Sequence, residues 1–302
     1  MTLDPAVITI IKSTTRAAVY GASTLIVGAA IFETIVVRRA IGLTPAERIT
    51  AMARARHLGY LAAWVLCLSY VARLYIQVID SFLVAMPTVD MLWQLIFSTR
   101  AWGRGVLAQL VISGCVLGLL TSARRGGRPA TAVTAVAAVL AAVAVPLTGH
   151  AIGHEGAIAV AAQAAHVFAA GGWLGTLTVL WLVCRRLAST VDVESIVRAF
   201  SPVALSSAAL LALAGVASYL LHVGTPSQLF SSRYGVVLLL KIAVFLSAAA
   251  IGYVNWRLVT PRLRESGQRA RFTRAAALEI ALAIVAILLT TVLTNLPQPD
   301  DE

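Results

Sequence analysis

Charged side chains are scarce in this chain. They make up 12% of its 302 residues, whereas hydrophobic residues make up 59%. A soluble domain of average composition carries about 25% charged residues, so the sequence is not that of a protein that folds in water. The mean hydropathy is +0.87, and apolar runs of about twenty residues, each long enough to cross a bilayer core as a helix, recur along the chain. Lipid is therefore the predicted solvent.

Several further features are missing. The three cysteines, Cys67, Cys115 and Cys184, show no CxxC spacing, so the sequence predicts neither a disulfide framework nor a thiolate metal site. The first apolar run ends in Arg38 and Arg39 rather than at a small-residue cleavage site, which predicts a retained span and not a removable signal peptide. No P-loop and no catalytic constellation is present, so we expect a protein that is not an enzyme.

The apolar runs predict an all-α, polytopic transmembrane bundle of about eight spans. Residues 79–103 mix Asp80, Pro87 and Asp90 with aromatic and aliphatic side chains, a pattern typical of a segment that lies at the membrane surface. The expected spans are 16–38, 57–78, 104–122, 129–149, 157–185, 199–222, 234–257 and 274–296.

The net charge of +11 is explained better by membrane topology than by nucleic-acid binding, because the basic residues cluster in short segments between apolar runs. Most of them follow spans one, three, five and seven, as in Arg124-Arg125 and Arg185-Arg186. Basic loops stay on the cytoplasmic side. We therefore expect a multi-pass protein of the bacterial inner membrane with both termini outside, and no nucleic-acid partner.

A faint internal repeat divides the chain. Residues 17–39 align without gaps to 164–186, pairing Gly28 with Gly175, and 97–100 (FSTR) resembles 230–233 (FSSR). Two four-helix halves in parallel orientation would produce such a pattern. We expect a first half at 1–149, with the outer interfacial segment 79–103, and a second half at 150–302.

Four of the five histidines lie in the second half. His150 ends span four, His154 follows beside Glu155, and His222 ends span six, so the predicted topology places all three at the outer face. Imidazole is a common ligand of transition metals, and converging histidines would form a metal site. Histidines also favour the polar interface of any membrane protein, so the spacing leaves both interpretations open. His57, at the inner end of span two, has no histidine at its level.

His166 differs because it lies inside span five, about 13 Å deeper than the outer face by the helical rise. An ionisable residue at such depth is costly and usually functional. Its spacing puts Gln163, His166, Ala170 and Trp173 on one helical face. A packing seam with one satisfied polar pair is the alternative interpretation of that face.

Other ionisable residues also fall within the spans. Lys241 is predicted near the depth of His166, where its ammonium group would either repel a metal ion, hold a ligand carboxylate, or extend to the outer surface. Glu33 and Glu279 lie near the predicted cytoplasmic side, so we expect both to pair with loop arginines.

Two stretches, LTGHAIGHEG at 147–156 and QAAHVFAAGGWLGTLTVLW at 163–181, resemble the copper resistance D (CopD) family. The resemblance continues through 199–263, with a Phe-Ser helix start, a Tyr-Gly-x-x-Leu-Leu-x-Lys span and a closing Pro-Arg-Leu. The CopD-like region thus covers about 145–265, while the first half fits by its number of spans.

The resemblance implies a cytoplasmic-membrane protein that moves or receives copper ions, often with a periplasmic copper-binding partner of the CopC type. It carries over to His150, His166, Trp173, His222, Tyr234 and Lys241, whereas His154 is particular to this chain. We therefore expect His150, His154, His166 and His222 to be copper ligands, with Glu155, Gln163, Trp173, Tyr234 and Lys241 supporting them. Only Met86 and Met91 lie outside, so no thioether route for copper(I) is predicted and the oxidation state stays open.

Copper import is the preferred hypothesis, and two alternatives stay open. Two histidines facing each other across a bundle could ligate haem iron, although the predicted depths of His166 and its partners differ by more than one turn. The chain could also be an assembly or sensing subunit that binds copper without transporting it.

Overall fold

A computed structural model describes residues 4–84, 86–98, 100–126, 129–148, 156–185, 190–222 and 228–296. All regular elements over these residues are helical. Eight helices are long and apolar enough to cross a membrane, which confirms the predicted number of spans and the all-α class.

The first half contains five α-helices of four or more residues and two short irregular turns of helix. Their bounds are α1 Pro5–Ile31, continued by the π-helix η1 Phe32–Val36 and by α2 Val37–Arg39, then α3 Pro45–Phe82, α4 Val89–Ser98, α5 Arg100–Arg124, and α6 Ala130–Ala144 with the 3-10 turn η2 Val145–Leu147.

The second half contains two spans that are interrupted by π-helical turns. Its elements are α7 Gly156–Ala170, η4 Gly171–Gly175 and α8 Thr176–Cys184 in one span, then α9 Thr190–His222, α10 Gln228–Ser231, α11 Arg233–Val254 with η5 Asn255–Val259 and η6 Thr260–Arg262, and α12 Gln268–Leu293.

Several helices begin well before their apolar runs. α1 begins at Pro5 because the Asp4 side chain caps it by accepting a hydrogen bond from the Ala6 amide at 2.8 Å. α3 begins at Pro45 because Thr44 and Glu47 form a capping box, in which each side chain satisfies a free amide of the first turn. The predicted starts at 16 and 57 are therefore too late: the apolar pattern marks the lipid-crossing part, whereas the caps mark the helix.

The segment between spans two and three is not long enough to cross a membrane. α3 ends where Leu83 adopts a left-handed conformation, with φ 53°, and the short apolar helix α4 follows. α4 folds back on the start of α5 at Gly103, where a Cβ atom would lie 1.8 Å from the Ile96 carbonyl oxygen. Trp93 and Phe97 stack and are largely exposed, as expected for an interfacial segment.

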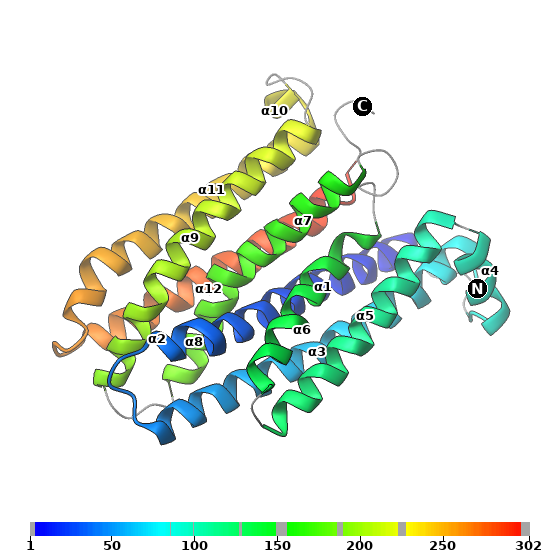
Figure 1. The fold of residues 1–302 in the computed structure, drawn as a ribbon. Coiled ribbons are helices and arrows are strands. Elements are labelled where there is room, and N and C mark those ends of the chain that lie inside the picture. The colour runs from blue at the N-terminus through cyan, green and yellow to red at the C-terminus, as the bar shows by residue number, and fades with distance from the viewer. Residues whose placement is uncertain are drawn as a thin grey trace.

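α1 lies at the centre of the bundle (Figure 1). It packs against α3 and α6 of the first half and against η4, α8 and α12 of the second. α11 lies at the periphery, where it packs along α12, and its span is the least buried of the eight. The two halves are thus joined mainly through α1.

The contact between α1 and η4 brings two backbones together at Gly28 and Gly175. A Cβ atom at Gly28 would lie 2.1 Å from the Gly175 carbonyl carbon, and one at Gly175 would lie 2.1 Å from the Thr24 carbonyl oxygen. Thr176 donates a hydrogen bond to the Gly28 carbonyl at 3.4 Å. Small residues are what permit such close helix approach inside a membrane.

We predict that Gly28→Ala lowers the unfolding temperature in detergent, because the added methyl group meets backbone that cannot rotate away. The expected cost is about 1–3 kcal/mol, typical of overpacking. Gly21→Ala is the matched control: it lies on the same helix, and a Cβ atom there meets nothing within 4 Å. Equal unfolding temperatures for the two variants would contradict this account of the interface.

Candidate functional site

The predicted outer histidines lie largely beyond what the structure describes. His150, His154 and Glu155 fall in residues 149–155, outside the described ranges. His222 is the last residue of α9, and its side chain is likewise outside the description. The convergence of imidazoles at the outer face therefore stays a prediction.

The remaining predicted site residues lie on α7, η4 and α11. Gln163 and His166 are on α7, Trp173 is in η4, and Tyr234 and Lys241 are on α11. Tyr234 lies at the start of its helix and is half-buried, as is Gln163 one turn before His166.

His166 is a half-buried polar residue of α7. Its Nδ1 atom is inaccessible and has no hydrogen-bond partner among the described residues. An orphaned polar atom costs free energy in water-free surroundings, so such atoms are rare unless something else binds there. His166 therefore presents a free nitrogen in the interior of the bundle.

Lys241 on α11 lies near enough to His166 for its charge to act on the imidazole. Lys241 is half-buried, and no carboxylate in the described part of the chain pairs with it. The structure thus brings together two residues at the same predicted depth, and it leaves the ammonium charge without a counter-ion among the described residues.

A second polar cluster lies farther along the spans that contain α7 and α11, and it includes Glu279 of the neighbouring helix α12. The Glu279 carboxylate on α12 accepts hydrogen bonds from the side chains of Trp173 and Asn255, and Glu279 is only 2% exposed. The Trp173 ring packs edge-on against Phe245, with centroids 5.8 Å apart. Gly252 leaves room for the carboxylate, because a Cβ atom there would lie 3.1 Å from Glu279 Oε2.

Both donors of this cluster lie in π-helical turns, Trp173 in η4 and Asn255 in η5. The wider turn of a π-helix redirects side chains, and such bulges are frequent at functional sites. Asn255 was not among the site residues predicted from the sequence. The signal that could have found it was a polar amide and a carboxylic acid in two neighbouring spans, each of which needs a partner in lipid.

The expectation that both buried glutamates pair with arginine is half right. Glu33 Oε1 accepts hydrogen bonds from Arg56 at 2.6 and 3.0 Å and from Thr131 at 3.0 Å, so its predicted pairing is confirmed. For Glu279 the prediction is wrong: the groups that hold its carboxylate are an indole and an amide.

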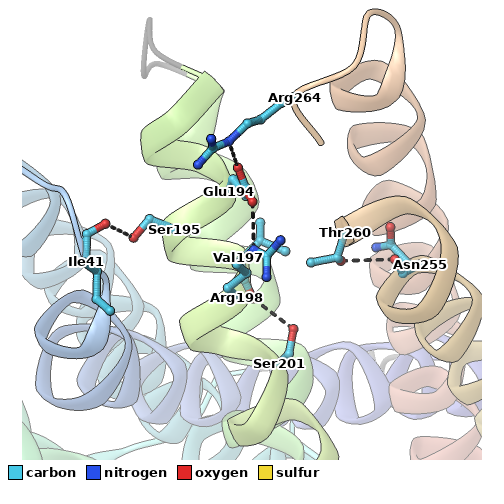
Figure 2. A network of polar contacts seen from close by, with 9 residues as sticks. All are labelled: Ile41, Glu194, Ser195, Val197, Arg198, Ser201, Asn255, Thr260 and Arg264. Atoms are coloured by element: carbon cyan, nitrogen blue, oxygen red, sulfur yellow. Dashed lines mark hydrogen bonds and ion pairs between the residues drawn. The ribbon is translucent and has the colours of Figure 1, made fainter. Parts of the chain in front are cut away.

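Polar contacts close one end of the bundle (Figure 2). Glu194 on α9 lies between Arg198, at 2.8 Å, and Arg264. Ser195 donates to the Ile41 carbonyl, and the Thr260 hydroxyl donates to the Asn255 carbonyl at 3.1 Å. We call this the arginine-rich end. These contacts join the loop after α2, the start of α9 and the chain after η6.

A small pocket lies at the arginine-rich end and does not include His166. It is lined by Trp181, Cys184, Arg185, Val193, Arg269, Phe272 and Thr273. Among the described residues, no group of three or more His, Cys, Asp and Glu side chains comes together as a metal site would require. A complete ligand set at His166 therefore needs groups from the rest of the chain.

Eight apolar spans define a multi-pass helical membrane protein. Its first half, residues 7–160, matches the family model of the copper resistance protein D-like N-terminal domain, and residues 194–293 match that of copper resistance protein D. The chain belongs to the copper resistance protein D family, which confirms the resemblance.

Two curated relatives agree with this assignment. The chain is 28% identical over 159 residues to the copper transport protein CutJ of Bacillus subtilis strain 168, an alignment that covers 51% of this chain and 28% of that protein. It is 30% identical over 156 residues to copper resistance protein D of Pseudomonas syringae pv. tomato, covering 46% of this chain and 50% of that protein. The alignments thus span half or less of these relatives. No solved structure matches the chain significantly.

The family matches differ in extent from the predicted region 145–265. They cover the first half and extend to residue 293, and His166 and Trp173 lie in the interval 161–193 between the two matched ranges. A functional role for His166 and Trp173 is therefore supported by their surroundings in the structure and not by the family matches.

We predict that Trp173→Phe destabilises the protein by about 1–3 kcal/mol, since it removes a donor from a buried carboxylate while keeping an aromatic ring against Phe245. Unfolding in detergent measures the effect. Trp64→Phe is the control, because Trp64 is 45% exposed on the outside of α3. If both variants unfold alike, Trp173 does not hold Glu279.

Proposed function

We propose that the protein imports copper ions across the bacterial inner membrane through its second half, with His166 as the deepest histidine ligand. The observation that carries this proposal is the free, buried Nδ1 atom of His166 within a membrane span of a chain that belongs to a copper-handling family. His150, His154 and His222 are proposed to collect the ion at the outer mouth.

The chemistry of His166 supports this role. Neutral imidazole nitrogen is a good ligand for copper, and a ligand already stripped of water needs no desolvation when the ion arrives. The absence of a hydrogen-bond partner in the described residues means that no existing bond must break. Burial thus favours binding, provided that the outer histidines complete the coordination.

Lys241 would lower the affinity of the site for a copper ion and so favour release of the ion. A transport site must bind well enough to load and weakly enough to unload. The Lys241 ammonium group acts on His166, and a cation nearby lowers the affinity for a second cation. We infer that Lys241 keeps the site from trapping copper, while Glu155, with Gln163, Trp173 and Tyr234, helps to shape it.

The proposed orientation has both termini outside and the arginine-rich end in the cytoplasm. Arg198 and Arg264 at that end support it through the positive-inside rule. In this orientation a periplasmic copper-binding protein of the CopC type would deliver the ion to the histidine mouth.

We predict that His166→Ala lowers the copper content of the purified protein at least tenfold and abolishes uptake into sealed vesicles, because the deepest ligand is lost. The same measurements on His150→Ala and His222→Ala should give intermediate losses, and His154→Ala should be mild. Metal analysis of detergent-purified protein checks the series.

His57→Ala is the matched control, as His57 is exposed on α3 and lies outside the proposed path. It should keep the copper content of the wild type. Equal copper content in all five variants would contradict the site. A Soret absorption band that His166→Ala removes would instead establish haem as the ligand, and copper binding without uptake would establish a subunit that does not transport.

A further inference from the structure

We propose that the ion is divalent copper and that Glu279 with Asn255 forms a second station for it, inward of His166. This inference rests on the proposed function and deepens it by naming the oxidation state and the next stop of the ion.

Sulfur is scarce in the second half of the chain. All four methionines lie in the first half, and the second half, residues 150–302, contains Cys184 as its one sulfur atom. Cys184 lines the pocket beside Trp181 and Arg269. Copper(I) prefers thiolate and thioether ligands, whereas nitrogen and oxygen donors in tetragonal arrangement suit copper(II). The second half offers the divalent ion far better ligands.

The cluster around Glu279 offers oxygen atoms to a metal ion. Glu279 supplies a carboxylate that is held by neutral donors. The Oδ1 atom of Asn255, which is 6% exposed, is buried and has no hydrogen-bond partner among the described residues. The carboxylate of α12 thus lies beside an amide of η5, and the oxygen of that amide is unsatisfied.

The surroundings leave the Glu279 charge uncompensated. The charged and titratable groups on the elements packed against α12 are Lys12, Arg16 and Tyr20 of α1, Cys184 of α8, Arg233, Tyr234, Lys241 and Tyr253 of α11, and Arg257 of η5; α12 itself carries Arg269, Arg271 and Arg274. Apart from the donors Trp173 and Asn255, no side chain acts on the carboxylate within the described residues. The carboxylate would therefore attract an arriving cation, which would not have to compete with a basic side chain of the protein.

The two stations are in line. Trp173 follows His166 by seven residues on the same span, which is about 10 Å toward the arginine-rich end. On α11, Lys241 lies near His166, and Phe245 packs edge-on against Trp173. The indole of Trp173 therefore separates the histidine from the carboxylate, and an ion passing from one to the other moves along the α7–α11 side of the bundle.

The oxidation state is tested by loading the purified full-length protein with copper(II) without reductant, and separately with copper(I) under ascorbate. We expect stoichiometric binding in the first case, with an electron paramagnetic resonance signal typical of nitrogen and oxygen ligands. Binding under ascorbate alone, with no paramagnetic signal, would overturn the inference while leaving copper binding at His166 intact.

The second station is tested by Glu279→Gln, which keeps the shape of the side chain and an acceptor for Trp173. We expect its copper(II) uptake into proteoliposomes to fall at least tenfold, while copper bound through His166 is retained. Glu33→Gln is the control: it alters the buried glutamate of the first half and should keep uptake within about twofold.

The outcomes separate the two proposals. Loss of copper binding from every form of the wild-type protein defeats the proposed function. Normal uptake by a folded Glu279→Gln protein, with uptake still dependent on His166, defeats only the second station. If Glu279→Gln fails to fold, Asn255→Ala removes the unpaired oxygen instead, and unchanged uptake in that variant has the same meaning.

Discussion

Inside a membrane no water is available to satisfy a polar side chain, so every ionisable group within a span must find its partner in the protein. Three ionisable groups of the described spans differ in how far they meet this requirement. Glu33 receives a full cationic partner in Arg56. Glu279 receives neutral donors without a cation. His166 keeps a buried nitrogen that no described residue satisfies. Glu33, in the first half of the chain, is therefore paired more completely than Glu279 and His166 in the second half.

This difference in pairing distinguishes the residues that hold the helices together from those of the proposed copper path. The Glu33–Arg56 pair fixes α1 to α3, and the close contact of Gly28 with Gly175 fixes α1 to the second half. α11, which carries Lys241, is attached to the bundle along α12. A packed centre with an outer helix that is held mainly by one neighbour is suited to holding ligands on one side while allowing the other side to move.

Much of the fold follows from composition alone, because lipid imposes one solution on an apolar chain of this length. The number of spans and the all-α fold class were predictable for that reason. The start of α3 was not, since the capping box of Thr44 and Glu47 extends the helix beyond the apolar run. The predicted repeat of two four-helix halves stays a prediction. The two glycines that it aligns, Gly28 and Gly175, contact each other, as residues near a pseudo-two-fold axis would.

The site was predictable only in part. His166 and Lys241 could be paired by depth, because helical rise converts sequence position into distance along the bundle. The partners of Glu279 could not, since they depend on how the π-helical turns of η4 and η5 rotate Trp173 and Asn255. Because arginines lie near Glu279 in the sequence of α12, an ion pair was the simpler expectation. The rotation of the helices instead places Trp173 and Asn255 beside the carboxylate.

The most direct test of the central claim is the X-ray absorption spectrum of the copper-loaded, full-length protein at the copper edge. The account predicts a first shell of nitrogen and oxygen with the outer scattering of imidazole rings, and it predicts that this scattering weakens when His166 is replaced by alanine. A first shell that contains sulfur, or a spectrum unchanged by that replacement, would contradict a histidine path through the second half.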